Sequence, residues 1–391
     1  MRTTWNSYSN PRLLFGAGAL NEIGKVIRRL KGSRVMIFSD PVIESLGIVG
    51  RVEKLLSAKV LVFAEGEVEP STNLVKRCAE QFRAFNPDVA IAIGGGSNMD
   101  LAKLACATVA SDKDPADLLG FDQVTRPIGN LVCIPTTAGT GSEASHSAVI
   151  CNSKTGQKAA AISHYLRPAV AVVDPELSLT CPQKLTAESG IDALSHAIEG
   201  YLASSFSILE ATDSGVLPYE GNHPMGDLYA EKGIRLIGEH FLKAVDEPSN
   251  LDARSGMALA ATLGGLAFSN CGVALAHALE YPIGNRYQCA HGAGIGIVLP
   301  AVLKFLRPAR EERIALIGCY LGVEETAEAV INEVIRLRRE SGLPQRLRDV
   351  GAKHEDIPSL AESAGLLERL MVLTANRPTL EDLRSIYEAS Y

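Results

Sequence analysis

The sequence lacks the features that place a protein outside the ordinary globular class. No segment approaches the roughly 18 uninterrupted apolar residues that a membrane-spanning helix needs. The N-terminus is polar and lacks the apolar stretch of a signal peptide. The formal net charge is -7, so we do not expect the basic face that nucleic acids and anionic membranes require. These absences predict a cytoplasmic protein that has neither nucleic acid nor membrane as a partner.

Cysteine is present but shows no pattern. The eight cysteines are scattered, mostly in apolar runs, and no two form a CxxC pair. This distribution favours buried, reduced thiols over a disulfide framework. The composition, 46% hydrophobic and 21% charged, is ordinary for a packed protein, and 391 residues suffice for two or three domains.

Short β-branched runs alternate with helix-period segments over the first 180 residues. Strands that are wholly apolar and separated by helices are typical of a parallel sheet covered on both faces. We therefore predict a doubly wound α/β domain over residues 1–180, with ligands beyond the carboxyl ends of its strands. The candidate strands are Val35–Ser39, Val60–Phe63, Val89–Ile93, Leu131–Ile134 and Val170–Val173.

The chain changes character near residue 180, where it becomes rich in Ala, Leu and Glu with helical spacing. Convincing strands disappear, and Ser204–Gly226, which contains Pro218, Gly221, Pro224 and Gly226, is typical of a long connection. We predict an all-α second domain over residues 181–391. Its candidate helices are 186–203, 226–246, 251–267, 270–280, 294–305, 311–321, 325–341 and 379–389.

A glycine-rich turn, GGGS (Gly94, Gly95, Gly96 and Ser97), follows the candidate strand Val89–Ile93 and opens a helix. Glycines let the backbone turn sharply and approach a ligand, and free N–H groups at a helix start can hold a phosphate. Ser97 suits the N-cap of that helix. The alternative is a plain strand-to-helix turn, but three successive glycines exceed what such a turn requires. The pattern favours a dinucleotide such as NAD.

Two further segments carry groups suited to the same ligand. Thr136 and Thr137 follow the strand Leu131–Ile134 and precede GTGSEA, a loose match to GxGxxA. Asp40 closes the strand Val35–Ser39, where a carboxylate can accept hydrogen bonds from ribose hydroxyls and repel the 2′-phosphate of NADP. An ordinary N-cap aspartate before Pro41 explains Asp40 equally well.

Four potential metal ligands lie in two distant segments of the second half. Asp192 and His196 are one helical turn apart, so both project from one helix face among apolar neighbours. His277 lies in an apolar run and His291 opens another. Each alone is more simply a surface or core residue, but one carboxylate with three imidazoles would complete the ligand set of Fe²⁺ or Zn²⁺.

The chain resembles the iron-containing (group III) alcohol dehydrogenase family from about Leu14 to beyond Pro300. The motifs that carry the resemblance are FGAGAL, GGGS with Asp100 and Lys103, IPTTAGTGSE, RPAVAVVDPEL, GIDALSHAIEGY, and HALEYPIG with AHG. Several long motifs in the right order make the match specific.

The resemblance implies a dehydroquinate-synthase-like architecture, with the active site between a dinucleotide-binding domain and a helical domain. By position, Asp192, His196, His277 and His291 match the family's metal ligands. Gly96, Ser97, Thr136, Thr137 and Lys158 match its cofactor contacts, which we extend to Gly94, Gly95 and Asp100. Asp40 matches the acidic residue that accompanies preference for NAD over NADP, although NADP stays open.

The chain departs from the family at two positions. Tyr281 stands where many members have a second histidine, and Asn98 stands where proline is frequent. A phenol one turn from a metal ligand could hydrogen-bond a substrate oxygen or join a proton relay, or it could simply pack before Pro282. His146 and Ser147 are weaker candidates for pocket groups, and the remaining histidines, His164, His223, His240 and His354, fit surface or structural roles.

The resemblance implies an NAD(P)-linked, metal-dependent alcohol dehydrogenase that also reduces aldehydes or ketones and assembles as a homodimer or larger. A maleylacetate-reductase-like or hydroxyacid dehydrogenase of the same family is the nearest alternative. A dehydroquinate-synthase-like lyase needs a Lys/Arg cluster, which the helical half's motifs lack. A silent scaffold or nucleotide sensor would be expected to lose ligands, whereas all four stand here.

Overall fold

The computed structural model describes residues 1–8, 11–210, 217 and 219–391 of the chain. These residues form two compact units. An α/β unit comprises Tyr8–Thr137 and Gly141–Thr180, and a helical unit comprises Met1–Ser7, Ala138–Thr140 and Cys181–Tyr391. The expected division at residue 180 therefore differs from the observed one at two short segments, which belong to the helical unit.

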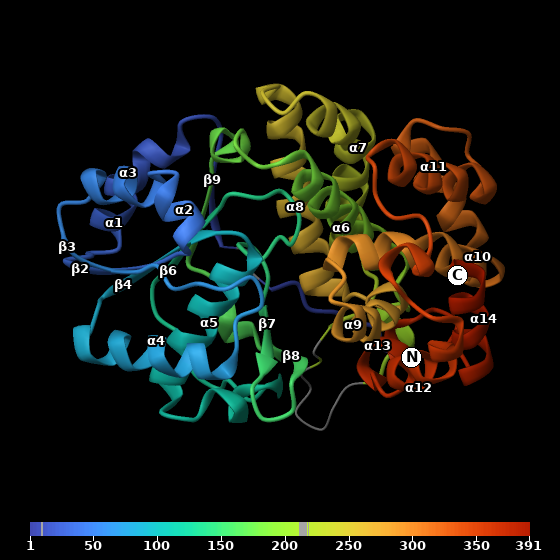
Figure 1. Ribbon diagram of the computed structural model, residues 1–391, viewed down its shortest axis with the longest axis horizontal. Helices are drawn as coiled ribbons and strands as arrows, with labels where there is room; N and C mark the ends of the chain where they lie inside the picture. Colours follow the sequence, from blue (N-terminus) through green and yellow to red (C-terminus); the bar gives the residue numbers. More distant parts are fainter. Residues whose placement is uncertain (9–10, 211–216, 218) are drawn as a thin grey trace. The chain divides into compact units, whose positions relative to one another are not determined.

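The α/β unit is built on a six-stranded, fully parallel sheet (Figure 1). The predicted strands form with shifts of a residue at their ends, and β1 is an addition. It pairs with β9, although no strand was expected before FGAGAL. The strand order is β1-β9-β6-β4-β2-β3, with bounds β1 Arg12–Phe15, β2 Arg34–Phe38, β3 Lys59–Phe63, β4 Val89–Gly94, β6 Leu131–Pro135 and β9 Val170–Val173.

Helices cover both faces of this sheet, as Figure 1 shows, which confirms the doubly wound fold. Alternate residues of β2 point to opposite faces of the sheet and contribute to two separate hydrophobic cores. Val35 and Ile37 pack with the α1 and α3 side, whereas Met36 and Phe38 pack with the α4 and α5 side. The helices are α1 Ile23–Arg29, α2 Pro41–Ser45, α3 Ile48–Leu55, α4 Thr72–Phe85 and α5 Gly96–Ser111.

A smaller three-stranded sheet, which the sequence did not reveal, completes the α/β unit. β7 (Ser147–Asn152) and β8 (Gln157–Ile162) form an antiparallel hairpin, and β5 (Gly120–Phe121) pairs with β8. The hairpin contacts the loop before α4, since Cys151 donates its N–H to the carbonyl of Pro70. This contact places Lys158 beside the loop that faces the start of α5.

The helical unit contains no strand of the main sheet among its described residues, and its helices pack around one large apolar core. Predicted helices form throughout, with α12 and α13 as additions. The bounds are α6 Gln183–Leu202, α7 Pro224–Asp246, α8 Leu251–Cys271, α9 Leu275–Tyr287, α10 His291–Leu321, α11 Ala327–Glu340, α12 Ile357–Gly365, α13 Glu368–Leu373 and α14 Leu380–Ser390.

Helix boundaries differ most near prolines. The candidate 270–280 is displaced, because α8 runs to Cys271 and α9 continues through Pro282. The two candidates 294–305 and 311–321 form the two parts of α10, which are separated by a kink with non-helical backbone at Arg310, as the division between them predicts. The expected connection over Ser204–Gly226 lies partly outside the described residues, and its described part is largely non-helical before α7.

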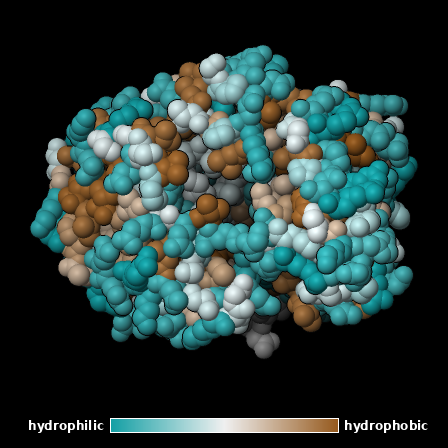
Figure 2. All heavy atoms as spheres, viewed as in Figure 1, coloured by the Kyte–Doolittle hydropathy of each residue, from teal (hydrophilic) through white to brown (hydrophobic). Residues whose placement is uncertain are grey.

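Helix α10 is long and apolar enough to cross a membrane. However, 67% of its most apolar 18-residue stretch is buried inside the protein, as in the core helix of a globular domain. The face shown in Figure 2 is mostly hydrophilic, with hydrophobic side chains in small groups. All eight cysteines are free thiols, and six are buried, as predicted.

Candidate active site

Three helices of the helical unit supply the four predicted metal ligands. Asp192 and His196 lie one turn apart on α6, His277 lies in the first turn of α9, and His291 is the first residue of α10. Gly292 permits the close approach of α10 to α6, because a Cβ there would lie 1.9 Å from the carbonyl oxygen of Glu188.

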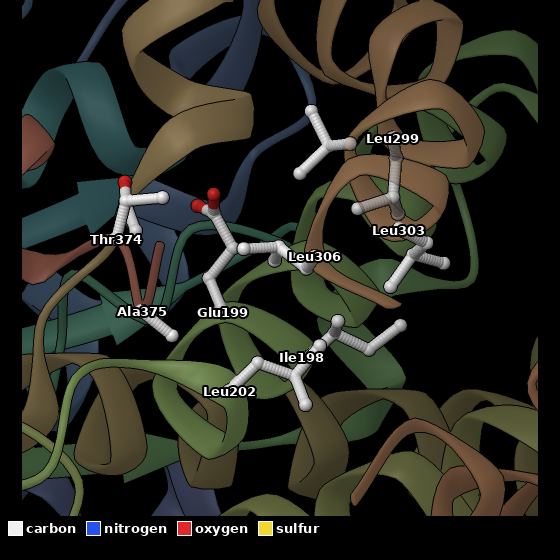
Figure 3. A pocket seen from close by; sticks show the side chains of 10 residues that line it. Ile198, Glu199, Leu202, Leu299, Leu303, Leu306, Thr374 and Ala375 are labelled. Carbon is white, nitrogen blue, oxygen red and sulfur yellow. The ribbon is translucent and has the colours of Figure 1, made fainter. Parts of the chain in front are cut away.

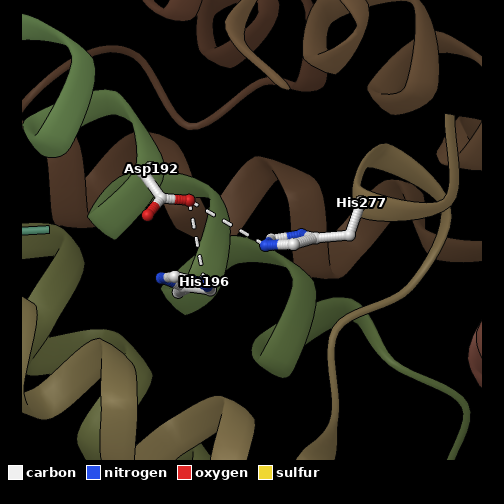
Figure 4. A group of neighbouring side chains, drawn as sticks. All are labelled: Asp192, His196 and His277. Atoms are coloured by element: carbon white, nitrogen blue, oxygen red, sulfur yellow. Dashed lines mark ion pairs between the residues drawn. The ribbon is translucent and has the colours of Figure 1, made fainter. Parts of the chain in front are cut away.

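The three imidazoles surround one oxygen of the carboxylate. The Nε2 atom of His196 lies 3.7 Å from Oδ1 of Asp192, and the Nε2 atoms of His277 and His291 each lie 3.9 Å from it. Figure 4 shows Asp192, His196 and His277 turned toward one another. One possible ligand atom from each of these three residues lies within 4.8 Å of the others. Ligands about 2.1 Å from one tetrahedral ion lie about 3.4 Å apart, so a small contraction would close this group on a cation.

The chemistry of these groups also fits a cation. Oδ1 of Asp192 and Nε2 of His277 are buried and have no hydrogen-bond partner among the described residues. Burial lowers the pKa of His196 to about 4, so this imidazole is neutral near pH 7 and keeps a lone pair for a metal. Buried polar atoms that lack partners are costly, and a divalent ion would satisfy them.

Two buried glutamates that sequence reasoning missed contact the Nδ1 atoms of two candidate ligand histidines, whose Nε2 atoms lie near Asp192. Glu199 contacts Nδ1 of His277 at 2.5 Å, and Glu280 contacts Nδ1 of His291. A signal was present in the sequence, since Glu199 follows His196, and Glu280 follows His277, by three residues. No sequence pattern alone says which histidine each glutamate contacts.

Glu199 also lines a small apolar cavity of about 10 Å³ inside the helical unit, shown in Figure 3. The cavity has room for about one water molecule at most, so it is no substrate pocket. Its other walls are mainly leucine, isoleucine and valine side chains. These walls keep the Glu199–His277 contact in surroundings of low dielectric constant, where an electrostatic contact is strong.

Tyr281 lies beside the metal-ligand group, with its ring stacked 6.0 Å from the ring of His291. Burial raises the pKa of Tyr281 to about 12, so the phenol keeps its proton near pH 7 and is suited to donate a hydrogen bond. Its oxygen is hydrogen-bonded to the guanidinium of Arg369 on α13, which also contacts the phenol of Tyr219. Arg369 is a neighbour of this site that sequence reasoning missed.

The glycine turn of the α/β unit has the backbone that phosphate binding needs. Gly94 ends β4 with φ of +140°, and a Cβ on it would lie 2.1 Å from Nδ2 of Asn98. The N-cap of α5 is Gly95, without a side-chain cap, so the expectation that Ser97 caps the helix is wrong. Ser97 instead donates its hydroxyl to the carbonyl of Val68. The first N–H groups of α5 are therefore left for a ligand.

The threonine loop lies beside this turn. Thr136 donates its N–H to the carbonyl of Gly94, and a Cβ on Gly95 would lie 3.7 Å from Oγ1 of Thr137. Lys158, on β8, pairs at 2.6 Å with Glu69, one residue from the carbonyl that Ser97 contacts. Gly94, Thr136 and Thr137 thus lie at the carboxyl ends of β4 and β6, and the cofactor role of these residues and of Lys158 stays a prediction.

Asp100 and Lys103 hold the loop that follows the threonines. Lys103 is fully buried and donates to the hydroxyls of Ser142 and Ser145. Asp100 accepts from the hydroxyl of Ser142 at 2.6 Å and from the N–H of Val149 at 2.8 Å. Both oxygens of Asp100 are thus engaged with the protein, while its expected contact with the cofactor stays a prediction.

Asp40 has the local role that the sequence left open. It is the N-cap of α2, with Oδ1 accepting from the N–H groups of Val42 and Ile43. Its Oδ2 accepts from Nδ2 of Asn98 at 2.5 Å. Asn98, where the family often has proline, therefore links Asp40 to the glycine turn. A ribose role for Asp40 stays a prediction.

The other histidines have contacts outside the metal-ligand group. His223 caps α7 and stacks on Trp5, and His354 pairs with Glu388 at the surface. His146, a weaker pocket candidate, is buried and stacks on His164 in the α/β unit.

A buried carboxylate–imidazole group and an uncapped glycine turn are the components of a metal-dependent, dinucleotide-linked oxidoreductase. The family model described as iron-containing alcohol dehydrogenase matches residues 10–175. The model described as the C-terminal part of the Fe-containing alcohol dehydrogenase family matches residues 186–391.

Individual relatives agree with the family models. The chain is 33% identical over 369 residues to the NAD-dependent methanol dehydrogenase of Bacillus methanolicus, covering 92% of this chain and 93% of the relative. It is 33% identical over 391 residues to long-chain-alcohol dehydrogenase 1 of Geobacillus thermodenitrificans, with 96% and 94% covered. A crystal structure of 1,3-propanediol oxidoreductase superimposes with a TM-score of 0.91 at 29% identity, covering 99% of this chain and 100% of the other.

The chain therefore belongs to the iron-containing alcohol dehydrogenase family. It is an oxidoreductase of the class that acts on alcohol groups, and the dehydroquinate-synthase-like lyase is not favoured. Asp192, His196 and His277 form its candidate metal site. The family resemblance, the fold class and the enzyme class predicted from the sequence are confirmed.

Proposed function

We propose that the enzyme interconverts a primary alcohol and its aldehyde, with NAD bound by the α/β unit and a metal held by the helical unit. The observation that carries this proposal is the group formed by Asp192, His196, His277 and His291, in which three Nε2 atoms lie 3.7 to 3.9 Å from one carboxylate oxygen. One carboxylate and three imidazoles suit Fe²⁺ or Zn²⁺.

A bound divalent ion would act as a Lewis acid on the substrate oxygen, lowering the pKa of an alcohol or polarising a carbonyl. The four ligands fix where that oxygen binds. The glycine turn and the Thr136–Thr137 loop would hold NAD, which when bound would supply hydride transfer, from the carbinol carbon to NAD⁺ in oxidation and from NADH to the aldehyde carbon in reduction.

Tyr281 is assigned the role of a hydrogen-bond donor to the substrate. Its raised pKa makes it a poor base near neutral pH, and Arg369 occupies a lone pair of its oxygen, which leaves the O–H to point elsewhere. Proton release then runs through water or the ribose hydroxyls, with Tyr281 stabilising the oxygen that changes charge.

The remaining assignments concern selectivity and cellular context. Asp40 is assigned a preference for NAD over NADP, because a carboxylate repels a 2′-phosphate. A cytoplasmic location fits the eight free thiols, which persist in reducing surroundings. The homodimer or larger assembly expected from the family resemblance stays a prediction that analytical ultracentrifugation can check.

Spectrophotometry on metal-loaded protein tests the proposal directly. Protein loaded with Fe²⁺ or Zn²⁺ is mixed with NAD⁺ and a series of primary alcohols, and NADH absorbance is followed. We expect NADH to form with at least one alcohol and NADPH to form more slowly from NADP⁺. The proposal would be contradicted if no alcohol reduced NAD⁺ or NADP⁺ and no aldehyde oxidised NADH or NADPH.

A second candidate, a hydroxyacid dehydrogenase, is favoured by Arg369. Its guanidinium contacts the phenols of Tyr281 and Tyr219, and no carboxylate of the described residues pairs with it. The guanidinium lies one phenol ring beyond the metal ligand His291. An arginine in this position could bind a carboxylate at the far end of a short ω-hydroxyacid.

A matched pair of substrates separates the two candidates. If the substrate is a hydroxyacid, kcat/KM for 4-hydroxybutanoate exceeds that for 1-butanol by at least about tenfold, and R369L removes the preference. R377L is the control, because Arg377 follows the same helix but pairs with Glu368 at the surface. Equal kcat/KM for both substrates, unchanged by R369L, leaves the neutral alcohol as the substrate.

A further inference from the structure

Two of the candidate metal ligands, His196 and His277, each begin the same four-residue sequence pattern, His-Ala-X-Glu. His196-Ala-Ile-Glu199 lies on α6, and His277-Ala-Leu-Glu280 lies on α9. In each copy the glutamate contacts the ligand histidine of another helix. Glu199 contacts His277, and Glu280 contacts His291, so the contacts connect α6 to α9 and α9 to α10.

The contacts of Glu199 and Glu280 determine which nitrogen of each ring is left for a metal. Each carboxylate is bound at Nδ1, and the Nε2 atoms of His277 and His291 each lie 3.9 Å from Oδ1 of Asp192. An imidazole that donates Nδ1–H to a carboxylate keeps its lone pair on Nε2 and becomes a stronger ligand. The two glutamates therefore preset the tautomer that metal binding needs.

Glu199 is held on both oxygens, whereas Glu280 depends on one contact. Glu199 also accepts the N–H of Ala276 at 2.6 Å, which fixes the carboxylate independently of His277. Glu280 is fully buried, and its Oε1 has no hydrogen-bond partner among the described residues. Gly294 leaves the space for it, since a Cβ there would lie 2.9 Å from Cγ of Glu280.

No lysine or arginine of the described residues pairs with Glu199 or Glu280. With Asp192, three buried or nearly buried carboxylates thus surround one group of imidazoles. Buried carboxylates without a cationic partner are costly, and a divalent ion at the Nε2 atoms would compensate them. His291 is the most exposed ligand, with 34% of its side chain accessible, so its orientation depends most on such an outer contact.

We propose that Glu199 and Glu280 are positioning residues for the metal, and that Glu280 governs how tightly the partly exposed ligand His291 retains it. This inference rests on the proposed metal site, to which it adds two residues. Removing Glu280 frees the His291 ring to rotate and lowers the basicity of its Nε2 atom. Removing Glu280 should therefore weaken metal binding and change the ligand field of the bound metal, and both effects can be measured without substrate.

Two readouts other than activity test the inference. The Zn²⁺ affinity is measured by competition with a chelator, and the visible absorption spectrum of Co²⁺-loaded protein reports the ligand geometry. We expect E280A to weaken Zn²⁺ binding by about 10- to 100-fold and to change the Co²⁺ spectrum. E280Q should lose less, because an amide oxygen still accepts from Nδ1–H but carries no charge. G294A should resemble E280A, since its methyl group displaces the glutamate.

E333Q is the matched control, because Glu333 is a buried glutamate of the same unit that pairs with Arg336 away from the site. It should leave the Zn²⁺ affinity and the Co²⁺ spectrum unchanged. Circular dichroism verifies folding, and E280Q, which keeps the side-chain volume, decides the question should E280A not fold. Wild-type affinity and spectrum in E280A or E280Q overturn the role of Glu280. A wild-type protein that binds no Zn²⁺ or Co²⁺ would instead contradict the proposed metal site and this inference with it.

Discussion

The two units carry their functional groups in different ways. In the helical unit the candidate ligands are side chains from three helices, spread over a hundred residues of sequence and buried together. In the α/β unit the glycine turn Gly94–Ser97 offers backbone groups of consecutive residues where β4 ends and α5 begins. The first arrangement depends on residue identity, and the second depends on backbone shape. Substitutions should therefore separate metal binding from nucleotide binding.

The largest expected effect is the loss of a metal ligand. H277A leaves only one imidazole firmly buried beside Asp192, so we expect loss of bound metal and a fall in kcat/KM of at least about 10³-fold. Metal content by atomic absorption and NADH formation measure the two effects. NAD⁺ binding, followed by calorimetry, should be unchanged. H354A, which alters a surface histidine paired with Glu388, is the control and should retain metal and activity.

The reciprocal substitution is G94A in the nucleotide turn. Alanine is strained at φ of +140°, and its Cβ would lie 2.1 Å from Nδ2 of Asn98. We expect the KM for NAD⁺ to rise at least about tenfold, which is about 1.4 kcal/mol, with metal content unchanged. G129A is the control, because Gly129 also has a positive φ, of +84°, but has nothing within 4 Å of its added Cβ. Loss of metal in G94A would break the proposed separation of the two units.

A smaller change should sharpen the assignment of Asp40. Serine also caps helices, so D40S should keep α2 intact while removing the carboxylate. We expect the ratio of kcat/KM for NAD⁺ to that for NADP⁺ to fall by about tenfold, because the repulsion of the 2′-phosphate is lost. D114S is the control, since Asp114 caps the short helix at Pro115–Leu118 in the same manner. An unchanged ratio would leave Asp40 with its capping role alone.

The smallest effect compares one buried thiol from each unit. Burial raises the pKa of Cys106 in α5 and of Cys271 in α8 from 9.0 to about 12. The unfolded chain then releases these protons at lower pH than the folded chain. The free energy of unfolding should fall by about 1.4 kcal/mol per pH unit for each thiol as the pH rises from about 9 toward about 12.

Denaturant unfolding at several alkaline pH values checks this effect. C106A and C271A should each flatten the pH dependence by a similar amount, whatever their effect on stability at neutral pH. A slope that is equal in all variants would show that the thiols titrate alike in the folded and unfolded chains.

The sequence predicts most of the central sheet because its strands are wholly apolar. It does not reveal β1, whose four residues alternate little and are only partly buried at the sheet edge. Strand β8 is hidden because its run of three alanines lacks the β-branched signal, and β7 has only Val149 and Ile150 between polar or small residues. Proline misleads at α9, which continues through Pro282, whereas the predicted helix ended at residue 280.

The candidate site is predictable where it depends on residue type. The four candidate ligands are predicted from their chemistry and from the family resemblance, and the structure places an imidazole nitrogen of each histidine within 3.9 Å of Oδ1 of Asp192. Glu280 and Arg369 could not be found in this way, because their roles depend on which side chains of other helices they meet. Ser97 illustrates the same limit, since a residue suited to an N-cap lies inside the first turn. Contacts between helices come from packing, which residue spacing alone does not determine.

The central claim is that Asp192, His196, His277 and His291 bind one cation. An anomalous difference map from crystals of the Zn²⁺- or Fe²⁺-loaded protein tests it most directly. The account predicts one peak about 2.0 to 2.2 Å from Oδ1 of Asp192 and from the Nε2 atoms of the three histidines. A peak at other residues, or no peak in metal-loaded crystals, would contradict it.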